Sequence, residues 1–258
     1  MCETAVLCEI DPKDRMTLPQ ASLFLDSLSS ENRDLLIDRS TPVVLPLRTV
    51  LYEAEEVPAY AYFMTSGIAS VVSTMSNGAT AEVGIVGREG VVGSLQLLGP
   101  GRVPTHCFMQ LDGTALKIPF SELKKAFRSS EELRDRILEF IQEQALSLSQ
   151  LAGCNRFHEA EERLARWLLM VQDRTQSDVL NLTQEFLAMM LGSQRSTVTL
   201  VAGSLQRSGL IEYQRGRVKI LNRENLEAAA CDCYQVTKHL YANLYKQRAL
   251  GVEKSLRA

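Results

Sequence analysis

Short apolar segments dominate the chain between about residues 41 and 120. They are rich in β-branched and aromatic residues, and some alternate apolar with small polar positions, which is typical of strands. Asn77-Gly78 suits a tight hairpin because both residues tolerate positive φ, and Gly87, Gly90 and Gly93 mark further turns. Many short strands joined by glycine turns predict a small barrel or jelly roll. The expected strands cover residues 43–47, 50–52, 60–64, 68–73, 81–86 and segments within 106–119.

From about residue 129 the apolar positions recur with helical spacing instead. Ser129-Ser130-Glu131-Glu132 places a capping serine and two acids at the expected start, and Gly153-Cys154 marks the expected end. Two interpretations stay open, because this helix can lie on its own barrel or join two chains as a dimerisation helix. A second helix is expected at 157–173. The a and d positions of the first helix are Ile137, Ile141, Gln144, Leu148 and Leu151.

Two short helices joined by a glycine turn come next. The first is expected at 182–192, with Thr183 as its N-cap and Gly192 at its end, and the second runs from 193 to about 207. This arrangement predicts a helix-turn-helix, whose second helix presents its N-terminal polar residues to the DNA major groove. The residues expected to pack the two helices together are Ala188, Leu191, Val198 and Val201.

A predicted β-hairpin follows the second helix of this motif. Residues 210–213 and 217–221 are its expected strands, and Gln214-Arg215-Gly216 forms the tip. Basic residues at and beside the tip identify the hairpin as a wing. A last helix is expected at about 224–247.

Charge is distributed unevenly along the chain. With 28 Lys and Arg against 31 Asp and Glu in 258 residues, the net charge of −3 argues against a generally basic nucleic-acid-binding protein. Residues 1–154 carry a net charge of −7, whereas residues 155–258 carry +4. Residues 193–223 alone hold six basic side chains and one acidic side chain, a net of +5. The basic excess therefore lies on the predicted second helix and wing, where phosphate contacts would make DNA binding salt-dependent.

Three stretches resemble the Crp/Fnr family of bacterial transcription regulators: residues 163–169 (RLARWLL), 182–192 (LTQEFLAMMLG) and 209–213 (GLIEY). The resemblance spans about residues 20–235 and implies an α+β fold. Its expected parts are an N-terminal β jelly-roll (cyclic-nucleotide-binding-like) sensor barrel, a long dimerisation helix and a C-terminal winged helix-turn-helix, at residues 1–128, 129–156 and 157–258. The resemblance also implies a homodimer on a two-fold symmetric site in double-stranded DNA, an effector event in the barrel, and contact with RNA polymerase if the protein is an activator.

The same resemblance assigns DNA contacts to particular side chains. The base-reading positions in the first turns of the second helix are Arg195, Ser196 and Thr199. Arg195 can contact guanine O6 and N7 with two hydrogen bonds, whereas Ser196 stands where the family often has Glu, so the commonest family half-site is not assumed. Positions that resemble phosphate contacts, together with two wing arginines added from charge placement, are Thr183, Gln184, Gln194, Thr197, Arg215 and Arg217.

The effector segment departs from that of family members that bind cyclic AMP. Those members carry Gly-Glu-Leu and, after a short loop, Arg with a small residue, because a cyclic phosphate needs a cation and helix-start amides. Here no Glu follows Gly90 or Gly93, and Pro104-Thr105-His106 stands near the expected Arg, although Arg102 lies in the loop. The sequence therefore argues against cyclic-nucleotide binding and leaves the effector unidentified.

Cysteine spacing argues against an iron–sulfur cluster as well. Oxygen-sensing members have a tight N-terminal cysteine cluster, whereas only Cys2 and Cys8 lie near this N-terminus. Cys231 and Cys233 are expected on one helix, where side chains two residues apart diverge. We interpret the cysteines as ordinary thiols and predict no metal site and no cofactor. The alternatives are a minor redox or metal role of these thiols and haem ligation by His106 or Cys107. The six cysteines are Cys2, Cys8, Cys107, Cys154, Cys231 and Cys233.

Enzyme motifs do not emerge from the sequence. A cupin-type metalloenzyme needs a cluster of His and Glu ligands, but of His106, His158 and His239 only His106 lies in the predicted barrel. His158, Trp167 and the Met189-Met190 pair are expected to be structural. The N-terminus lacks a signal-peptide pattern and no apolar run approaches the roughly 20 residues of a membrane span, so we expect a cytoplasmic protein without membrane contact. The competing hypothesis is a redox or small-molecule sensor that acts through protein contacts and carries a vestigial DNA-binding motif.

Overall fold

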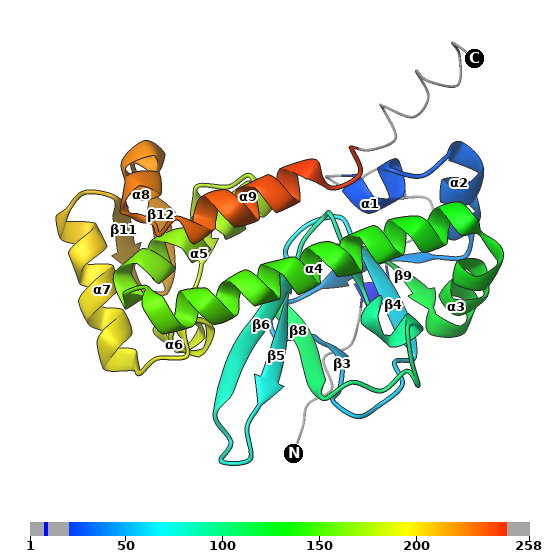
Figure 1. The fold of residues 1–258 in the computed structure, drawn as a ribbon, viewed down its shortest axis with the longest axis horizontal. Helices are drawn as coiled ribbons and strands as arrows, with labels where there is room; N and C mark the ends of the chain where they lie inside the picture. Colours follow the sequence, from blue (N-terminus) through cyan, green and yellow to red (C-terminus); the bar gives the residue numbers. More distant parts are fainter. Residues whose placement is uncertain (1–7, 10–20, 247–258) are drawn as a thin grey trace, which may run out of the picture.

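One long helix, α4 (Glu131–Phe157), connects the two parts of the molecule. The computed structural model describes residues 8–9 and 21–246. A β-barrel lies against α4 along much of its length, and a mainly helical domain follows at the C-terminal end of α4, in yellow and orange in Figure 1. None of the described helices is both long and apolar enough to cross a membrane.

The barrel consists of two antiparallel sheets with the strand orders β1-β2-β9-β4-β7 and β3-β8-β5-β6. Alternating side chains of both sheets fill the interior, where Leu45, Met64 and Met109 are completely buried. The predicted jelly-roll barrel is therefore confirmed. The strands are β1 (Cys8–Glu9), β2 (Thr41–Leu45), β3 (Val50–Tyr52), β4 (Tyr60–Met64), β5 (Ile68–Thr74), β6 (Thr80–Val86), β7 (Val91–Val92), β8 (Thr105–Leu111) and β9 (Gly113–Pro119).

The predicted hairpin between β5 and β6 is present, although Asn77 and Gly78 contribute in different ways. Gly78 takes a positive φ of 82°, whereas the side-chain Oδ1 of Asn77 accepts a hydrogen bond from the Ala79 N–H at 3.0 Å. Asparagine commonly bonds to the backbone two residues ahead in this way.

Three helices that the apolar pattern did not reveal pack around one side of the barrel. They are α1 (Leu23–Asp26), α2 (Ser30–Asp38) and α3 (Phe120–Ser129). The periodicity of α1 and α2 is weak because these short helices contribute few buried residues, such as Phe24 from α1 and Leu36 from α2. These two side chains join Phe63 of β4 and Leu133 of α4 in one apolar cluster.

Helix α4 begins as predicted but does not end where expected. Ser130 Oγ accepts a hydrogen bond from the Leu133 N–H at 3.2 Å, which confirms the serine cap. The expected break at Gly153 is wrong, because the helix continues to Phe157. An isolated glycine costs a helix only about 1 kcal/mol, and the fully buried Cys154 packs the last turns in place.

The C-terminal domain combines helices with a small sheet of order β10-β12-β11. The expected single helix at 224–247 is wrong as far as the described residues reach, since Ala230 is extended (ψ 151°) and a new helix starts at Cys233. The elements of this domain are α5 (Ala160–Thr175), β10 (Val179–Asn181), α6 (Gln184–Leu191), α7 (Arg195–Arg207), β11 (Ile211–Gln214), β12 (Arg217–Ile220), α8 (Arg223–Ala229) and α9 (Cys233–Asn243).

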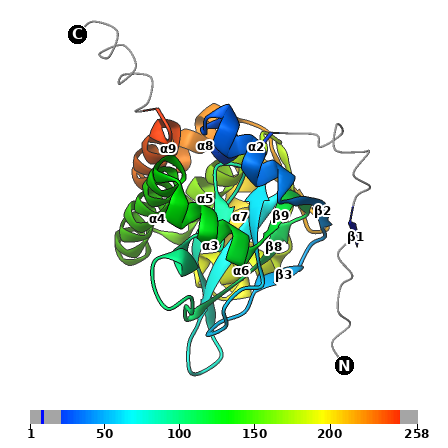
Figure 2. The ribbon, with the colours of Figure 1, turned by 90° about the vertical axis from the view of Figure 1, so that its right-hand side faces the viewer.

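Helix α9 lies alongside α4 and leads the chain back toward the barrel (Figures 1 and 2). Beyond its end, the Tyr245 N–H donates to Glu139 Oε1 and the Tyr245 hydroxyl donates to the Glu89 carbonyl, both at 2.6 Å. The Tyr245 ring also packs edge-on against Phe24. The C-terminal domain is thus attached to the first domain at its exit as well as at its entry.

Candidate nucleic-acid interface and sensor cavity

Helices α6 and α7 form the predicted helix-turn-helix. Thr183 Oγ1 accepts a hydrogen bond from the Phe186 N–H at 3.3 Å, and Gly192 ends α6 in the left-handed conformation with φ 56°. Both predicted helix signals are confirmed. The predicted packing is confirmed too, because Ala188, Leu191 and Val198 are buried in the core of this domain and Val201 packs against it.

The wing is a tight hairpin of β11 and β12. Gln214 pairs with Arg217, and the two residues between them, Arg215 and Gly216, both have positive φ, at 51° and 75°. This is the backbone of a two-residue turn whose twist suits antiparallel strands. A Cβ built on Gly216 would lie 3.7 Å from Thr183 Cγ2, so the tip of the wing lies beside the N-terminus of α6.

The side chains predicted to contact DNA are accessible. Arg195, Ser196 and Thr199 are exposed on the first turns of α7, and Thr197 beside them is half-buried. We call Arg195, Ser196, Thr199 and the exposed wing arginines Arg215 and Arg217 the reading face. The remaining predicted phosphate contacts are also exposed, namely Thr183, Gln184 and Gln194.

The N-terminus of α7 favours an anionic partner. Its first turn carries no acidic side chain, and the Gln194 side chain at the N-cap makes no capping hydrogen bond. The free N–H groups and the positive end of the helix dipole therefore point toward the side where a phosphate would lie.

Both domains match known protein families. Residues 42–130 match the cyclic nucleotide-binding domain, and residues 162–229 match the Crp-like helix-turn-helix domain. The chain belongs to the Crp/Fnr family of transcription regulators. Membership makes it a regulator rather than an enzyme, as the sequence predicted.

Solved structures of other regulators share the fold at low sequence identity. FixK2 from Bradyrhizobium japonicum is 17% identical, with a TM-score of 0.63 over 74% of this chain and 98% of its own. A Crp/Fnr regulator from Eubacterium rectale is 17% identical, with a TM-score of 0.62 over 80% and 97%. The c-di-GMP-responsive regulator CLP from Xanthomonas campestris is 18% identical, with a TM-score of 0.61 over 75% and 100%. No curated protein matches the chain in a sequence comparison.

In this Crp/Fnr protein the main candidate base-reading side chain has an intramolecular partner. Arg195 Nη2 lies 3.1 Å from Glu185 Oε1 of α6, and the other oxygen of Glu185 lies 3.6 Å from Arg48 of the barrel. Thr199 Oγ1 in turn donates to the Arg195 carbonyl at 3.0 Å. Sequence reasoning missed Glu185 and Arg48, because a carboxylate that holds the arginine from the preceding helix has no signature of its own.

The barrel of this Crp/Fnr protein contains a cavity of about 240 Å³ between β5, β6, β7 and α4. Its walls include Tyr52, Val86, Phe140 and Leu148, and none of the described residues that line it is charged. Arg102 is exposed and does not line the cavity. The cavity offers no cation for the phosphate of a cyclic nucleotide.

His106 and Cys107 do not face this cavity. Cys107 is fully buried between the two sheets, where burial raises the pKa of its thiol. His106, on the opposite face of β8, stacks on Phe108. Neither side chain lines the cavity, so the geometry gives no support to haem ligation there.

Buried polar contacts join the barrel to the C-terminal domain, and we call Glu82, Glu89, Trp167 and Arg174 the interdomain seam. Trp167 Nε1 donates to Glu82 Oε1 at 2.8 Å, and Arg174 Nε donates to Glu89 Oε1 at 2.8 Å. Trp167 is buried as predicted, while the two carboxylates were missed. The Met189-Met190 pair belongs to the packed interior around α5 and α6, where Met190 is buried and Met189 is partly buried.

Glu82 is the carboxyl group of the seam whose pKa is raised above its ordinary value. Burial raises the pKa of its carboxyl from 4.5 to about 7, although hydrogen bonds from Ser70 and Trp167 and the charge of Arg166 act in the opposite direction. The group therefore changes charge near neutral pH.

The predicted dimerisation residues fall in different environments along α4. Ile137 is fully buried in its own domain, so its assignment to a dimer contact is wrong. A heptad pattern shows which residues lie on the same side of a helix. It does not show whether that side packs on the chain's own domain or stays exposed for a partner. Ile141, Gln144 and Leu151 are half-buried, whereas Leu148 is 44% exposed.

Proposed function

We propose that this protein is a homodimeric, sequence-specific DNA-binding regulator of transcription that reads a two-fold symmetric operator. The observation that carries the proposal is the reading face, which presents Arg195, Ser196 and Thr199 on the first turns of α7 beside a basic wing. Exposed polar residues at this end of the second helix are what major-groove reading requires. RNA polymerase is a further expected partner if the protein activates transcription, and we expect it to act in the cytoplasm, where bacterial DNA is.

An exposed apolar stripe on α4 supports the dimer. Leu138, Ala145 and Leu148 are exposed, and the half-buried Ile141 lies between them at heptad spacing. This stripe differs from the predicted dimerisation stripe at two positions. Leu138 replaces Ile137 and Ala145 replaces Gln144, each one residue further along the helix. Two such helices related by a two-fold axis would cover each other's apolar side chains.

Oligomeric state tests this stripe directly. Leu138 is 41% exposed on α4, and Leu35 is 38% exposed on α2, away from the stripe. We expect Leu138→Glu to convert the dimer to a monomer in light scattering at micromolar concentration, while Leu35→Glu leaves the mass unchanged. A wild-type monomer, or a Leu138→Glu dimer, would contradict this interface.

For the effector we infer an uncharged, largely apolar small molecule that fits the barrel cavity. Ala145 and Leu148 both line the cavity and belong to the α4 stripe, so a ligand there would contact the dimer helix directly. Cyclic AMP and c-di-GMP carry phosphates for which the described lining has no cation. Calorimetric titration with either nucleotide should therefore give no binding heat, and micromolar binding would contradict the proposal.

DNA-site selection with the purified protein is the experiment that tests the function. Once an operator is selected, we expect Arg195→Ala to lose about 1–3 kcal/mol of binding free energy and its preference at one base pair of each half-site. The control is Arg207→Ala at the far end of α7, which should weaken binding uniformly without changing base preference. Fluorescence anisotropy at several salt concentrations measures both effects.

Failure of this experiment has a clear meaning. If no sequence is enriched, with and without cell extract, the helix-turn-helix is vestigial and the protein acts through protein contacts instead. If sequences are enriched but Arg195→Ala keeps full affinity and specificity, the assignment of the base-reading residues is wrong.

A further inference from the structure

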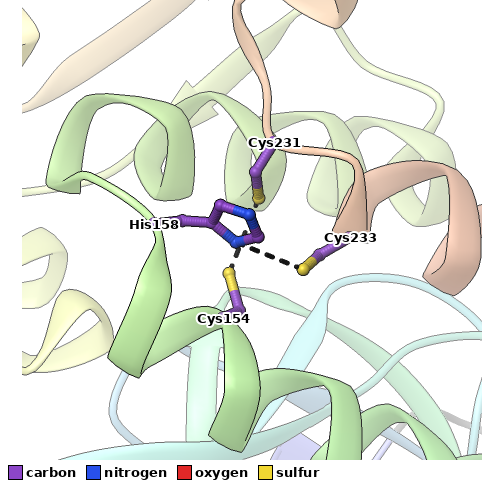
Figure 3. Close-up of side chains that lie close together, drawn as sticks. All are labelled: Cys154, His158, Cys231 and Cys233. Atoms are coloured by element: carbon purple, nitrogen blue, oxygen red, sulfur yellow. Dashed lines mark hydrogen bonds between the residues drawn. The ribbon is translucent and has the colours of Figure 1, made fainter.

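Four metal-ligating side chains converge where α4 ends and α9 begins (Figure 3). Cys154 lies in the last turns of α4, and His158 is the residue that ends this helix. Cys231 lies in the link between α8 and α9, and Cys233 is the first residue of α9. The three sulfurs and a ring nitrogen of His158 all lie within 4.8 Å of one another.

The expectation that Cys231 and Cys233 diverge is wrong, because only Cys233 is helical. Cys231 precedes α9 in non-helical backbone, so its side chain is free to turn toward the same point as that of Cys233. Cys154, Cys231 and Cys233 are all buried and form a small cluster of their own. Three thiols facing one another and an imidazole form a soft donor set.

We propose that Cys154, His158, Cys231 and Cys233 bind one Zn²⁺ ion in tetrahedral geometry. With Zn–S bonds of about 2.3 Å and Zn–N bonds of about 2.0 Å, a regular tetrahedron has S–S edges of about 3.8 Å and S–N edges of about 3.5 Å. Cys154 Sγ lies 3.5 Å from Cys231 Sγ, and Cys233 Sγ lies 3.4 Å from His158 Nδ1. Both separations are within a few tenths of an ångström of these edges.

The surroundings of the histidine have the arrangement common at zinc sites. His158 directs Nδ1 toward the sulfurs, and its other ring nitrogen, Nε2, lies 3.2 Å from Asp232 Oδ1. A carboxylate on the second nitrogen fixes the tautomer and orientation of a metal-bound imidazole. The amide of Gln150 donates to Cys233 Sγ at 3.0 Å, which is a typical way to hold a thiolate in place.

A buried cation beside the cluster is the second independent observation. The Arg166 side chain is 5% exposed, its Nε has no hydrogen-bond partner among the described residues, and its Nη1 donates to the thioether of Met170, a weak acceptor. The charge of Arg166 acts on Cys154 and Cys231 as well as on Glu82. Three thiolates, a neutral histidine and Zn²⁺ carry a net charge of −1, which would compensate this arginine.

Two other fates of the thiols fit the geometry less well. A disulfide requires sulfurs about 2.05 Å apart, whereas Cys154 and Cys231 are 3.5 Å apart. In an iron–sulfur cluster the protein ligands bind different iron atoms, so they lie further apart than four ligands that share one ion. A single tetrahedral ion is therefore the occupant that these distances favour.

The position of the site gives the ion a structural role. Two ligands lie at the C-terminal end of α4 and two lie at or just before the start of α9, so one ion would fasten the C-terminal domain to the end of the long helix. Structural Zn²⁺ sites with four protein ligands act in this way, as a link between segments distant in sequence.

Metal analysis of the full-length protein, purified under reducing conditions, tests the proposal without reference to DNA. We expect one Zn²⁺ per chain, with at least a tenfold loss of bound metal in Cys231→Ser and in His158→Gln. The matched controls are Cys107→Ser, a buried thiol in the barrel, and His239→Gln on α9, and both should keep the metal. Replacement by Co²⁺ should give the visible bands of a tetrahedral ion and sulfur-to-cobalt charge transfer.

Each alternative result would overturn the site. Loss of metal from the controls but not from the cluster variants would place it elsewhere, and an iron–sulfur chromophore would exclude a single Zn²⁺. A chain that takes up neither Zn²⁺ nor Co²⁺ when reduced would show that the thiols form no metal site. If Cys231→Ser fails to fold, Co²⁺ spectra of the wild type with and without thiol alkylation give the same answer.

Discussion

The reading face and the interdomain seam both depend on charged side chains, but in opposite environments. Arg195 and Glu185 are 65% and 60% exposed, whereas Arg174 and Glu89 are 4% and 1% exposed. An exposed ion pair contributes at most about 1 kcal/mol, while a buried pair that loses one partner costs several times more. DNA can therefore replace Glu185 at Arg195 with little loss. In the proposed function, sequence reading and domain position depend on separate groups, so variants can test them independently.

The largest effect is expected from breaking the buried ion pair of the seam. Arg174→Met leaves Glu89 buried without its cation and should lower the free energy of unfolding by about 3–5 kcal/mol in urea denaturation. The control is Arg33→Met, which removes an exposed pair with Asp34 and should cost less than about 1 kcal/mol.

A double variant separates the charge effect from lost packing. Glu89→Gln combined with Arg174→Met removes both charges, so it should be more stable than Arg174→Met alone. If the double variant is the less stable of the two, the contribution of Arg174 comes from its other contacts, with the Met170 carbonyl and the Tyr241 ring.

The second effect is pH-dependent and belongs to Glu82. Its pKa is raised from 4.5 to about 7 in the folded protein, so the folded state binds this proton more tightly than the unfolded chain. Glu82 thus contributes stability that is fully present below about pH 4.5 and is lost as the pH rises through about 7. Between about pH 5 and about pH 8, this amounts to roughly 2–3 kcal/mol.

Glu82→Gln should remove this dependence because an amide does not titrate. Its oxygen can still accept the hydrogen bond from Trp167 Nε1, and its NH2 group can donate to the Ser70 hydroxyl. Urea unfolding at the two pH values measures the difference, with the exposed Glu53→Gln as a control that should behave like the wild type. An unchanged pH profile in Glu82→Gln would assign the titration to another group.

The smallest effect is expected at the reading face itself. Glu185→Gln releases Arg195 from its intramolecular partner and removes a negative charge near the DNA. Operator affinity should therefore rise by up to about fivefold, in keeping with at most about 1 kcal/mol for an exposed pair. Arg48→Ala breaks only the outer contact of Glu185 and should change affinity less. Weaker DNA binding in Glu185→Gln would mean that Glu185 orients Arg195 for reading.

The C-terminal domain could be predicted from sequence because its signals are local. The cap at Thr183, the left-handed Gly192 and the Arg215-Gly216 turn each act within a few residues of their own position. The seam offered no such signal. Glu82 and Trp167 are 85 residues apart, and so are Glu89 and Arg174, and each acid looks like an ordinary surface residue until the fold buries it.

The thiol cluster shows the same limit in another form. The ligands come in two close pairs, Cys154 with His158 and Cys231 with Cys233. Spacing rules expect two such pairs within about 20 residues of each other, whereas Cys154 and Cys231 are 77 residues apart. The Cys231–Cys233 pair was misread because no glycine or proline marks the break between α8 and α9. The assignment of Ile137 failed for a related reason, since periodicity does not distinguish a face that packs on its own domain from one left for a partner.

The contacts of Tyr245 restrict how the C-terminal domain can move. A domain attached through a single linker can rotate in any direction about that linker. Here the chain enters the domain from α4 and leaves it through α9 to Tyr245, which bonds to Glu89 and Glu139. If the buried contacts of the interdomain seam open while both attachments hold, the remaining freedom is rotation about the line that joins the two attachments. A signal from the barrel would then need to set only one angle to place α7 against DNA.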